Sequence, residues 1–288
     1  MRIVSALMMS ILATACDAAP SNLGQQAEAS SETQGPTVLS AKPVRFKASD
    51  NVMVHGRYYE AQAPKALILL FHQAGSNKSE YASIAPRLTE AGYSALAIDQ
   101  RSGGNMFGGR NETVASIGQN GGYLDAKRDL EAALAWAGDK RLPIVLWGSS
   151  YSASLLFPLA AEHPGKAVAL LAFSPGEYLG GGNPVRSAAA KVNVPLFVTS
   201  ATDAEEIVEA KALIDAAAAR LKTLFVPISG GVHGSSTLIA DRNPDGAEEA
   251  WKAVLQFLEN VEMANRSSLA RQPHTRARSI RLDSAHDR

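Results

Sequence analysis

The sequence predicts an α/β fold in which a mostly parallel sheet carries helices on both faces. One observation is that short runs such as 67–71, 143–147 and 167–173 are continuously apolar, as in parallel strands buried on both faces. Another is that these runs alternate with segments of helical periodicity. A stretch of about 220 residues, 43–261, is long enough to bury the core of one such domain.

The edge of the sheet comes first along the chain. Residues 44–46 and 52–59 alternate enough to pair as antiparallel strands. The apolar run 67–71 then starts the parallel part. Residues 79–91 are predicted as a helix, because Ser79 and Glu80 suit its start and Gly92 follows its end. The later strands are predicted at 95–98, 143–147, 167–173, 195–203 (ending in a polar turn) and 223–228, and the later helices at 124–137, 151–161 with a kink at Pro158, 205–219 and 247–258.

A tight turn of small residues follows the strand 143–147 and leads into a helix. In a strand-to-helix turn that presents a nucleophile, the residues two before and two after the central serine must be small. Ser150 meets this requirement with Gly148 and Ser152, whereas Ser149 would place Trp147 in the turn. The pattern indicates Ser150 as a nucleophile. An ordinary strand-to-helix turn remains the alternative, since Ser152 stands where glycine is usual.

Asp203 and His233 complete a candidate catalytic set. Asp203 follows the strand 195–203, and His233 lies in the glycine-rich loop after 223–228. A serine hydroxyl needs a base to remove its proton, and a carboxylate orients the imidazole that acts as that base. The alternative acid is Glu177, in the loop after 167–173, which is otherwise a loop residue that shapes the pocket.

The chain resembles small bacterial α/β-hydrolases of the dienelactone hydrolase-like group over 43–261. The matching pieces are His72–Gly75, 97–104, the turn 148–152, 173–175, Asp203 and His233. The resemblance implies an α/β-hydrolase fold and the order Ser150, Asp203, His233 for the catalytic residues. The interval 175–195 is too short for a large cap domain, so we expect an open site.

The same resemblance implies an oxyanion hole. The donors would be the backbone N–H groups of Ala74 and Tyr151. Many relatives have His-Gly where this chain has His72-Gln73, so Gln73 stays open as a donor. His72 is interpreted as a residue that braces the loop through backbone hydrogen bonds.

The first residues indicate export. Arg2 precedes a short apolar run, and Cys16 is the only cysteine of the chain. The segment around it resembles a bacterial lipoprotein cleavage box, which predicts a signal peptide at 1–15, an acylated Cys16 and a flexible tether at 16–42. An ordinary secretory signal cleaved after Ala15 is the alternative. We expect a membrane anchor facing the periplasm, and Asp17 resembles an inner-membrane retention signal.

Charge and motifs narrow the partners. The chain has no formal net charge, but its end from Asn265 carries six Arg against two Asp. Residues 262–288 are predicted to be a basic, disordered tail, with contact to anionic lipid as a second interpretation. An exported chain without a phosphate-binding loop or paired cysteines predicts no nucleic acid, no cofactor and no metal.

These features together predict a serine hydrolase that cleaves small-molecule carboxylic esters through an acyl-enzyme intermediate. Amide or peptide cleavage by the same residues is one alternative, and a catalytically inactive binding lipoprotein is another. The complete set of Ser150, Asp203 and His233 favours an enzyme. Acyl length and oligomeric state stay open.

Overall fold

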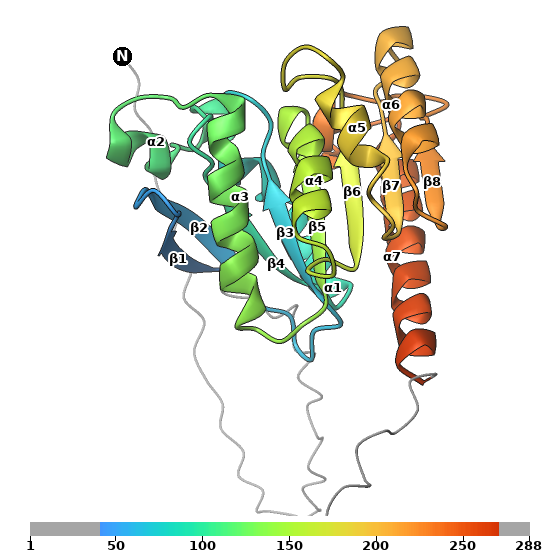
Figure 1. Cartoon of the computed structure of the whole chain (residues 1–288), viewed down its shortest axis with the longest axis horizontal. Coiled ribbons are helices and arrows are strands. Elements are labelled where there is room, and N and C mark those ends of the chain that lie inside the picture. The colour runs from blue at the N-terminus through green and yellow to red at the C-terminus, as the bar shows by residue number, and fades with distance from the viewer. Residues whose placement is uncertain (1–40, 271–288) are drawn as a thin grey trace, which may run out of the picture. The chain divides into compact units, whose positions relative to one another are not determined.

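The computed structural model describes residues 41–270, and its centre is an eight-stranded sheet (Figure 1). The strand order is β1-β2-β4-β3-β5-β6-β7-β8, with β2 antiparallel to both of its neighbours and all other pairs parallel. The strands are β1 (Lys42–Lys47), β2 (Met53–Tyr59), β3 (Leu67–Phe71), β4 (Ser94–Ile98), β5 (Ile144–Ser149), β6 (Ala169–Phe173), β7 (Leu196–Thr199) and β8 (Lys222–Phe225). The predicted mostly parallel sheet is confirmed.

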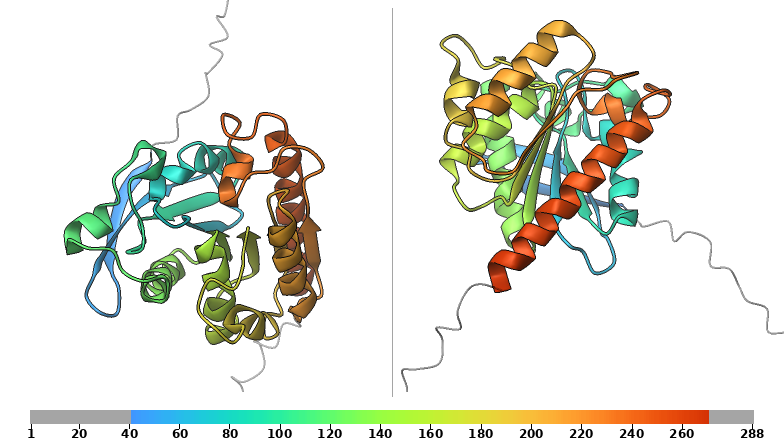
Figure 2. Two further views of the ribbon diagram at one scale, coloured as in Figure 1. Left: turned by 90° about the horizontal axis from the view of Figure 1, so that it is seen from above. Right: turned by 90° about the vertical axis from the view of Figure 1, so that its right-hand side faces the viewer.

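Helices cover both faces of the sheet (Figure 2). One face carries α3, α4, α5 and α6, and the other carries α1 and α7. The helices are α1 (Ile84–Glu90), α2 (Glu112–Ile117), α3 (Tyr123–Gly138), α4 (Tyr151–Glu162), α5 (Pro184–Ala189), α6 (Ala204–Ala216) and α7 (Ala247–Ala270), with short 3-10 turns η1 (Lys78–Tyr81), η2 (Met106–Gly108) and η3 (Gly234–Leu238). Only α5 lies between β6 and β7, so this interval holds no large cap.

The central strands are apolar throughout because neither face of the sheet meets water. Every residue of β3, β4, β5 and β6 is buried. Beneath α7, Trp147 stacks on Phe173 with ring centres 4.5 Å apart, and Phe197 lies 5.6 Å from Phe257 of the helix. Such aromatic pairs add to the free energy gained from burial. They join three neighbouring strands to the last helix.

Several element boundaries differ from the prediction, and proline explains two of them. The predicted helix 79–91 is divided into η1 and α1, because in one continuous helix the ring of Pro86 would meet the carbonyl of Ala82. Strand β8 stops at Phe225, two residues before Pro227, which has no N–H for the ladder. Helix α4, in contrast, continues through Pro158 to Glu162.

The last helix corrects the predicted start of a disordered tail at 262. Helix α7 runs on to Ala270, and within it Arg266 pairs with Glu262, one turn away, at 2.5 Å. The signal peptide 1–15, Cys16 and most of the tether 16–42 lie outside the described residues, as does 271–288. No helix in the described part of the chain is long and apolar enough to cross a membrane.

Candidate active site

Ser150 occupies a strained turn between β5 and α4. Its backbone angles are φ 60° and ψ −126°, a combination that an L-residue adopts only when its surroundings impose it. The Ser150 N–H donates to the Phe173 carbonyl at 2.8 Å, which fixes the turn to β6. A Cβ on Gly148 would lie 2.5 Å from the Ala153 nitrogen, so only glycine fits there. This is the geometry expected of a nucleophile elbow.

Ser152 stands where glycine is usual and ties the elbow to the neighbouring strand. Its hydroxyl donates to the Phe71 carbonyl at 2.6 Å and accepts the Ser149 N–H at 2.9 Å. Ser149 itself is fully buried, and its hydroxyl accepts the N–H of Ser235 at 2.9 Å. Of the two adjacent serines, only Ser150 lies at the turn and is partly exposed.

His233 lies in the loop between β8 and η3, beside the elbow. A Cβ on the next residue, Gly234, would lie 2.4 Å from Ser149 Oγ, so the two loops are in contact. The Gly234 N–H also donates to Ser174 Oγ, at the end of β6, at 2.9 Å. The carboxyl ends of β5 and β8, which precede Ser150 and His233, therefore lie at the same end of the parallel sheet (Figure 2, left).

The carboxylate paired with His233 belongs to Glu206. Its Oε1 lies 2.6 Å from Nδ1 of His233, and its Oε2 accepts the Ala201 N–H at 2.9 Å. Burial acts to raise the pKa of Glu206, but the hydrogen bonds from His233, Ala201 and Ser174 outweigh it and lower the pKa to about 2. Glu206 is therefore ionised at neutral pH and holds His233 through Nδ1.

The predicted acid, Asp203, and its alternative, Glu177, both accept backbone N–H groups at the starts of helices. The Asp203 carboxylate is exposed and caps α6 by accepting the N–H groups of Glu205 and Glu206, so it does not reach His233. Glu177 accepts the N–H groups of Val185 and Arg186 at the start of α5. The expectation that either carboxylate pairs with His233 is therefore corrected in favour of Glu206.

The sequence held a signal for Glu206 in the spacing Asp203-Ala204-Glu205-Glu206. A capping residue followed three positions later by Glu is typical of a helix N-terminus, where the Glu side chain turns back toward the preceding loop. This spacing uses Asp203 as the cap and points Glu206 toward the end of β7. The Ala201 N–H and His233 both meet it there.

The loop after β3 supplies the candidate oxyanion donors. The Gln73 N–H donates to Glu80 Oε2 at 2.9 Å, so the expectation that Gln73 could contribute its N–H is corrected. The N–H groups of Ala74 and Tyr151 have no protein acceptor among the described residues. Tyr151 begins α4, and the positive end of the helix dipole favours negative charge beside it.

His72 braces this loop through hydrogen bonds to backbone groups. It is completely buried; its Nδ1 donates to the Gln73 carbonyl at 2.8 Å and its Nε2 accepts the Gln100 N–H at 2.9 Å. Burial lowers the pKa of His72 to about 4, so the ring is neutral at physiological pH. The Gln100 side chain accepts a hydrogen bond from the backbone N–H of His72 and donates one to the Tyr151 hydroxyl at 3.0 Å. One buried network thus connects both sides of the candidate oxyanion hole.

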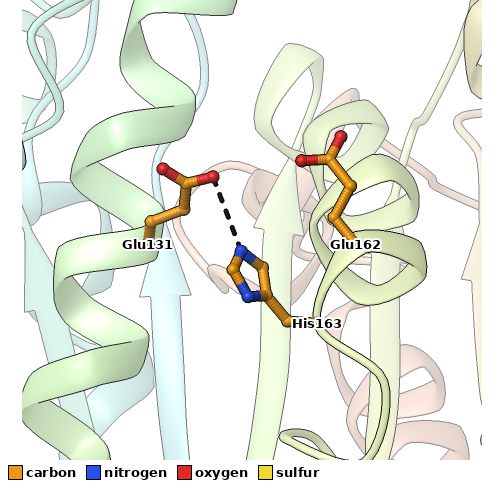
Figure 3. Close-up of side chains that lie close together, drawn as sticks. All are labelled: Glu131, Glu162 and His163. Carbon is orange, nitrogen blue, oxygen red and sulfur yellow. Dashed lines mark ion pairs between the residues drawn. The ribbon is translucent and has the colours of Figure 1, made fainter.

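One group of side chains away from the elbow has metal-ligand character (Figure 3). Glu131 of α3, Glu162 of α4 and His163 place one ligand atom each within 4.8 Å of one another, and His163 Nε2 lies 3.5 Å from Glu131. The Lys127 ammonium already forms ion pairs with both carboxylates. The group therefore already contains a cation, and it lies at the C-terminal end of α4, whereas Ser150 lies at the N-terminal end of that helix.

The chain matches a family model over residues 62–218, more than half of its length. The model is described as "Serine aminopeptidase, S33" (Hydrolase_4). No curated protein sequence matches the chain significantly.

Solved hydrolases share the fold. A dienelactone hydrolase from Anabaena variabilis superposes with a TM-score of 0.60 at 15% identity, covering 77% of this chain and 97% of its own. A thermostable carboxyl esterase from Bacillus coagulans gives 0.59 at 11% identity, covering 77% and 99%. An esterase from Pyrococcus furiosus gives 0.58 at 18% identity, covering 77% and 93%. At these identities the likeness concerns the α/β-hydrolase fold.

Proposed function

Because the chain belongs to the Hydrolase_4 family of α/β-hydrolases, described as serine aminopeptidases, we propose that it is a serine hydrolase that cleaves carboxylic esters. Ser150 is the nucleophile, His233 the general base and Glu206 the acid that orients it. The observation that carries the proposal is the 2.6 Å contact of His233 with Glu206 beside the strained turn of Ser150. Strain of this kind persists where function requires a defined geometry.

The first half of the reaction forms an acyl-enzyme. The Ser150 hydroxyl attacks the ester carbonyl carbon while its proton passes to Nε2 of His233, the nitrogen that Glu206 leaves available. The N–H groups of Ala74 and Tyr151 stabilise the negative charge that develops on the carbonyl oxygen. The tetrahedral intermediate then breaks its ester C–O bond, and His233 returns the proton to the leaving alcohol.

The second half releases the acid. Water attacks the acyl carbon, His233 takes a proton from it, and collapse of the second tetrahedral intermediate returns that proton to Ser150. Glu206 remains ionised throughout and stabilises the imidazolium that forms in each half. Its low pKa is consistent with this role.

Amide or peptide cleavage by the same residues is the second candidate, favoured by the description of the family model. The chemistry differs in the leaving group, since an amine must be protonated before it departs. The names of the structural neighbours, two esterases and a dienelactone hydrolase, favour esters. The two candidates therefore differ in a measurable preference.

A labelling experiment tests the proposal directly. A fluorophosphonate probe should react stoichiometrically with the wild type and not with Ser150→Ala, while Ser116→Ala, a surface serine on α2, should react normally. Turnover is then measured with chromogenic esters of graded acyl length and with aminoacyl amides. Preferential turnover of the amides would select the second candidate. Folded wild type without labelling or turnover would support an inactive binding protein instead.

We further propose that the mature protein is a lipoprotein anchored through Cys16 at the periplasmic side of a bacterial membrane. The support is the sequence around Cys16 and the tether that follows it. An anchor of this kind would hold the hydrolase domain near the membrane surface. Its ester substrates would then be those that reach the cell envelope.

A further inference from the structure

Glu80 is a buried acid that the proposed reaction does not use. It lies in η1, directly after the loop that carries Ala74, and only 1% of its surface is exposed. It forms no ion pair within the described residues, and the neighbouring Lys78 pairs instead with Asp99 and Glu112. Burial raises the pKa of Glu80. An unpaired buried carboxyl is costly, so its position calls for a compensating use.

One oxygen of Glu80 holds the candidate oxyanion loop. Its Oε2 accepts the Gln73 N–H at 2.9 Å, and the Gln73 carbonyl in turn accepts Nδ1 of His72 and the Ser76 N–H. Because the Gln73 N–H donates to Glu80, the next N–H along the loop, that of Ala74, is the one available to donate to a substrate carbonyl. The carboxyl thus selects which backbone group faces the reacting carbonyl.

The other oxygen, Oε1, is buried and has no hydrogen-bond partner in the described part of the chain. Burial raises the pKa of the Glu80 carboxyl, and the nearby hydroxyls of Ser149 and Ser76 act in the opposite direction. Ser149 Oγ accepts the Ser235 N–H at 2.9 Å, and Ser235 lies two residues after His233. Glu80 therefore stands between the loop of Ala74, the residue before Ser150 and the loop of His233.

We propose that Glu80 is a positioning residue that aligns the oxyanion loop with Ser150 and His233. The inference rests on the proposed function, because the loops it joins are those of the hydrolase site. Glu80 acts through Gln73 and Ser149 and does not touch the substrate. Its effect should fall on the transition state, where the oxyanion forms, and much less on substrate binding.

Three substitutions separate positioning from simple stability. Glu80→Gln keeps the length and an oxygen that accepts the Gln73 N–H, whereas Glu80→Asp is too short and Glu80→Ala has no acceptor. We expect Glu80→Gln to retain kcat within about threefold. The two shortened variants should lose kcat by roughly 100-fold, as when one oxyanion donor is removed, with KM changed less than about threefold. Glu60→Gln, at an exposed ion pair, is the matched control.

An arylboronic acid supplies a readout that stability alone would not move. Its affinity, which depends on a tetrahedral adduct at Ser150, should fall in parallel with kcat/KM across the three variants. Near-UV circular dichroism and thermal unfolding verify the fold of each protein. If Glu80→Ala fails to fold, Glu80→Asp carries the comparison with Glu80→Gln.

Each outcome decides the proposal. Folded Glu80→Asp or Glu80→Ala with nearly normal kcat would overturn it, as would a loss in Glu80→Gln equal to that in Glu80→Ala. Unfolding of both shortened variants beside a fully active Glu80→Gln would reduce Glu80 to a structural residue. If the wild type neither reacts with the fluorophosphonate probe nor hydrolyses any ester, both the proposed function and the role of Glu80 are wrong. If the wild type is active and the Glu80 variants are unaffected, only the role of Glu80 is wrong.

Discussion

The carboxylate that contacts His233 lies in the first turn of helix α6. Glu206 is the third residue of α6, and its side chain turns back to the Ala201 N–H and to Nδ1 of His233. Asp203 closes the same helix end by accepting two backbone N–H groups. Two acids three residues apart thus have separate roles, one structural and one at the site, which single substitutions can distinguish.

Glu206→Gln should therefore abolish most activity. Gln keeps the size and can still accept the Ala201 N–H, but it cannot stabilise an imidazolium. We expect kcat to fall by about 10³- to 10⁴-fold with the fold intact, as for loss of the carboxylate in a serine protease triad. Asp203→Ala should leave kcat within about threefold while costing about 1 kcal/mol of stability through the lost cap. Steady-state kinetics and urea unfolding measure the two effects, and the opposite pattern would return the acid to Asp203.

His72 makes stability depend on pH. Its pKa is about 4 in the folded protein, because burial of the ring outweighs the hydrogen bonds with Gln73 and Gln100 and the charge of Asp99, which act to raise it. In the unfolded chain it returns to about 6.5. Between these values the unfolded chain binds one proton more, so the free energy of unfolding decreases as pH falls from 6.5 to 4. The decrease attributable to His72 is about 3 kcal/mol.

His72→Asn should remove this component. The variant is less stable at neutral pH, because a buried hydrogen bond is lost, but its stability should change less between pH 7.5 and 4.5 than that of the wild type. The difference should be about 2 to 3 kcal/mol in urea unfolding at the two pH values. Parallel losses in both proteins would mean that His72 does not carry the effect.

At the scale of elements, the junction of β5 and α4 combines strain with close packing. On the strand side of the turn lies Gly148, where no Cβ fits, and on the helix side lies Ser152, whose hydroxyl donates to the Phe71 carbonyl of β3. Neighbours on β3 and β6 hold the strained Ser150 between them. Such strain costs of order 1–3 kcal/mol and is supported by the surrounding structure.

Ser150→Gly should relieve this strain. Glycine adopts a positive φ without penalty, although its greater freedom in the unfolded chain offsets part of the gain. We expect Ser150→Gly to be about 1 kcal/mol more stable than Ser150→Ala, with both variants inactive. Chemical denaturation of the pair measures the difference. A less stable glycine variant would show that the turn is not strained in solution.

At the scale of the whole molecule, parallel topology gathers the site at one edge of the sheet. The loops after β3, β5, β6, β7 and β8 all begin at the carboxyl ends of adjacent or near-adjacent strands, which point upward in Figure 1. Residues far apart in the chain meet there, as Ser149 and Ser235 do. The helices on both faces leave this edge free for loops.

Cys16→Ser tests the location proposed for this molecule. The wild type expressed in a bacterial host should sediment with membranes and extract into detergent, because acyl chains on Cys16 partition into the bilayer. Cys16→Ser should be soluble or remain unprocessed. Mass spectrometry of the mature N-terminus identifies the modification. Soluble wild type that begins with an unmodified residue would support the secretory alternative.

The sequence by itself determined the layered α/β architecture, the central strands and the elbow. Continuous apolar strands, helical periodicity and the small residues around Ser150 are local patterns with direct physical causes. The sequence also placed His233 in the loop after the predicted strand 223–228 and predicted that His72 braces a loop, which its hydrogen bonds with Gln73 and Gln100 confirm. Local patterns carry this much because backbone sterics and burial act over a few residues.

Only the tertiary structure decided which carboxylate meets His233 and what lies beneath the oxyanion loop. Asp203, Glu206 and Glu177 all follow strands, and they differ only in where each side chain is directed once α5 and α6 pack. Glu80 likewise lies in a segment predicted to be one helix, and its contact with Gln73 depends on how the separate turn η1 packs against the loop after β3. Hydrogen-bond partners depend on three-dimensional placement within a few tenths of an ångström, which spacing along the chain does not specify.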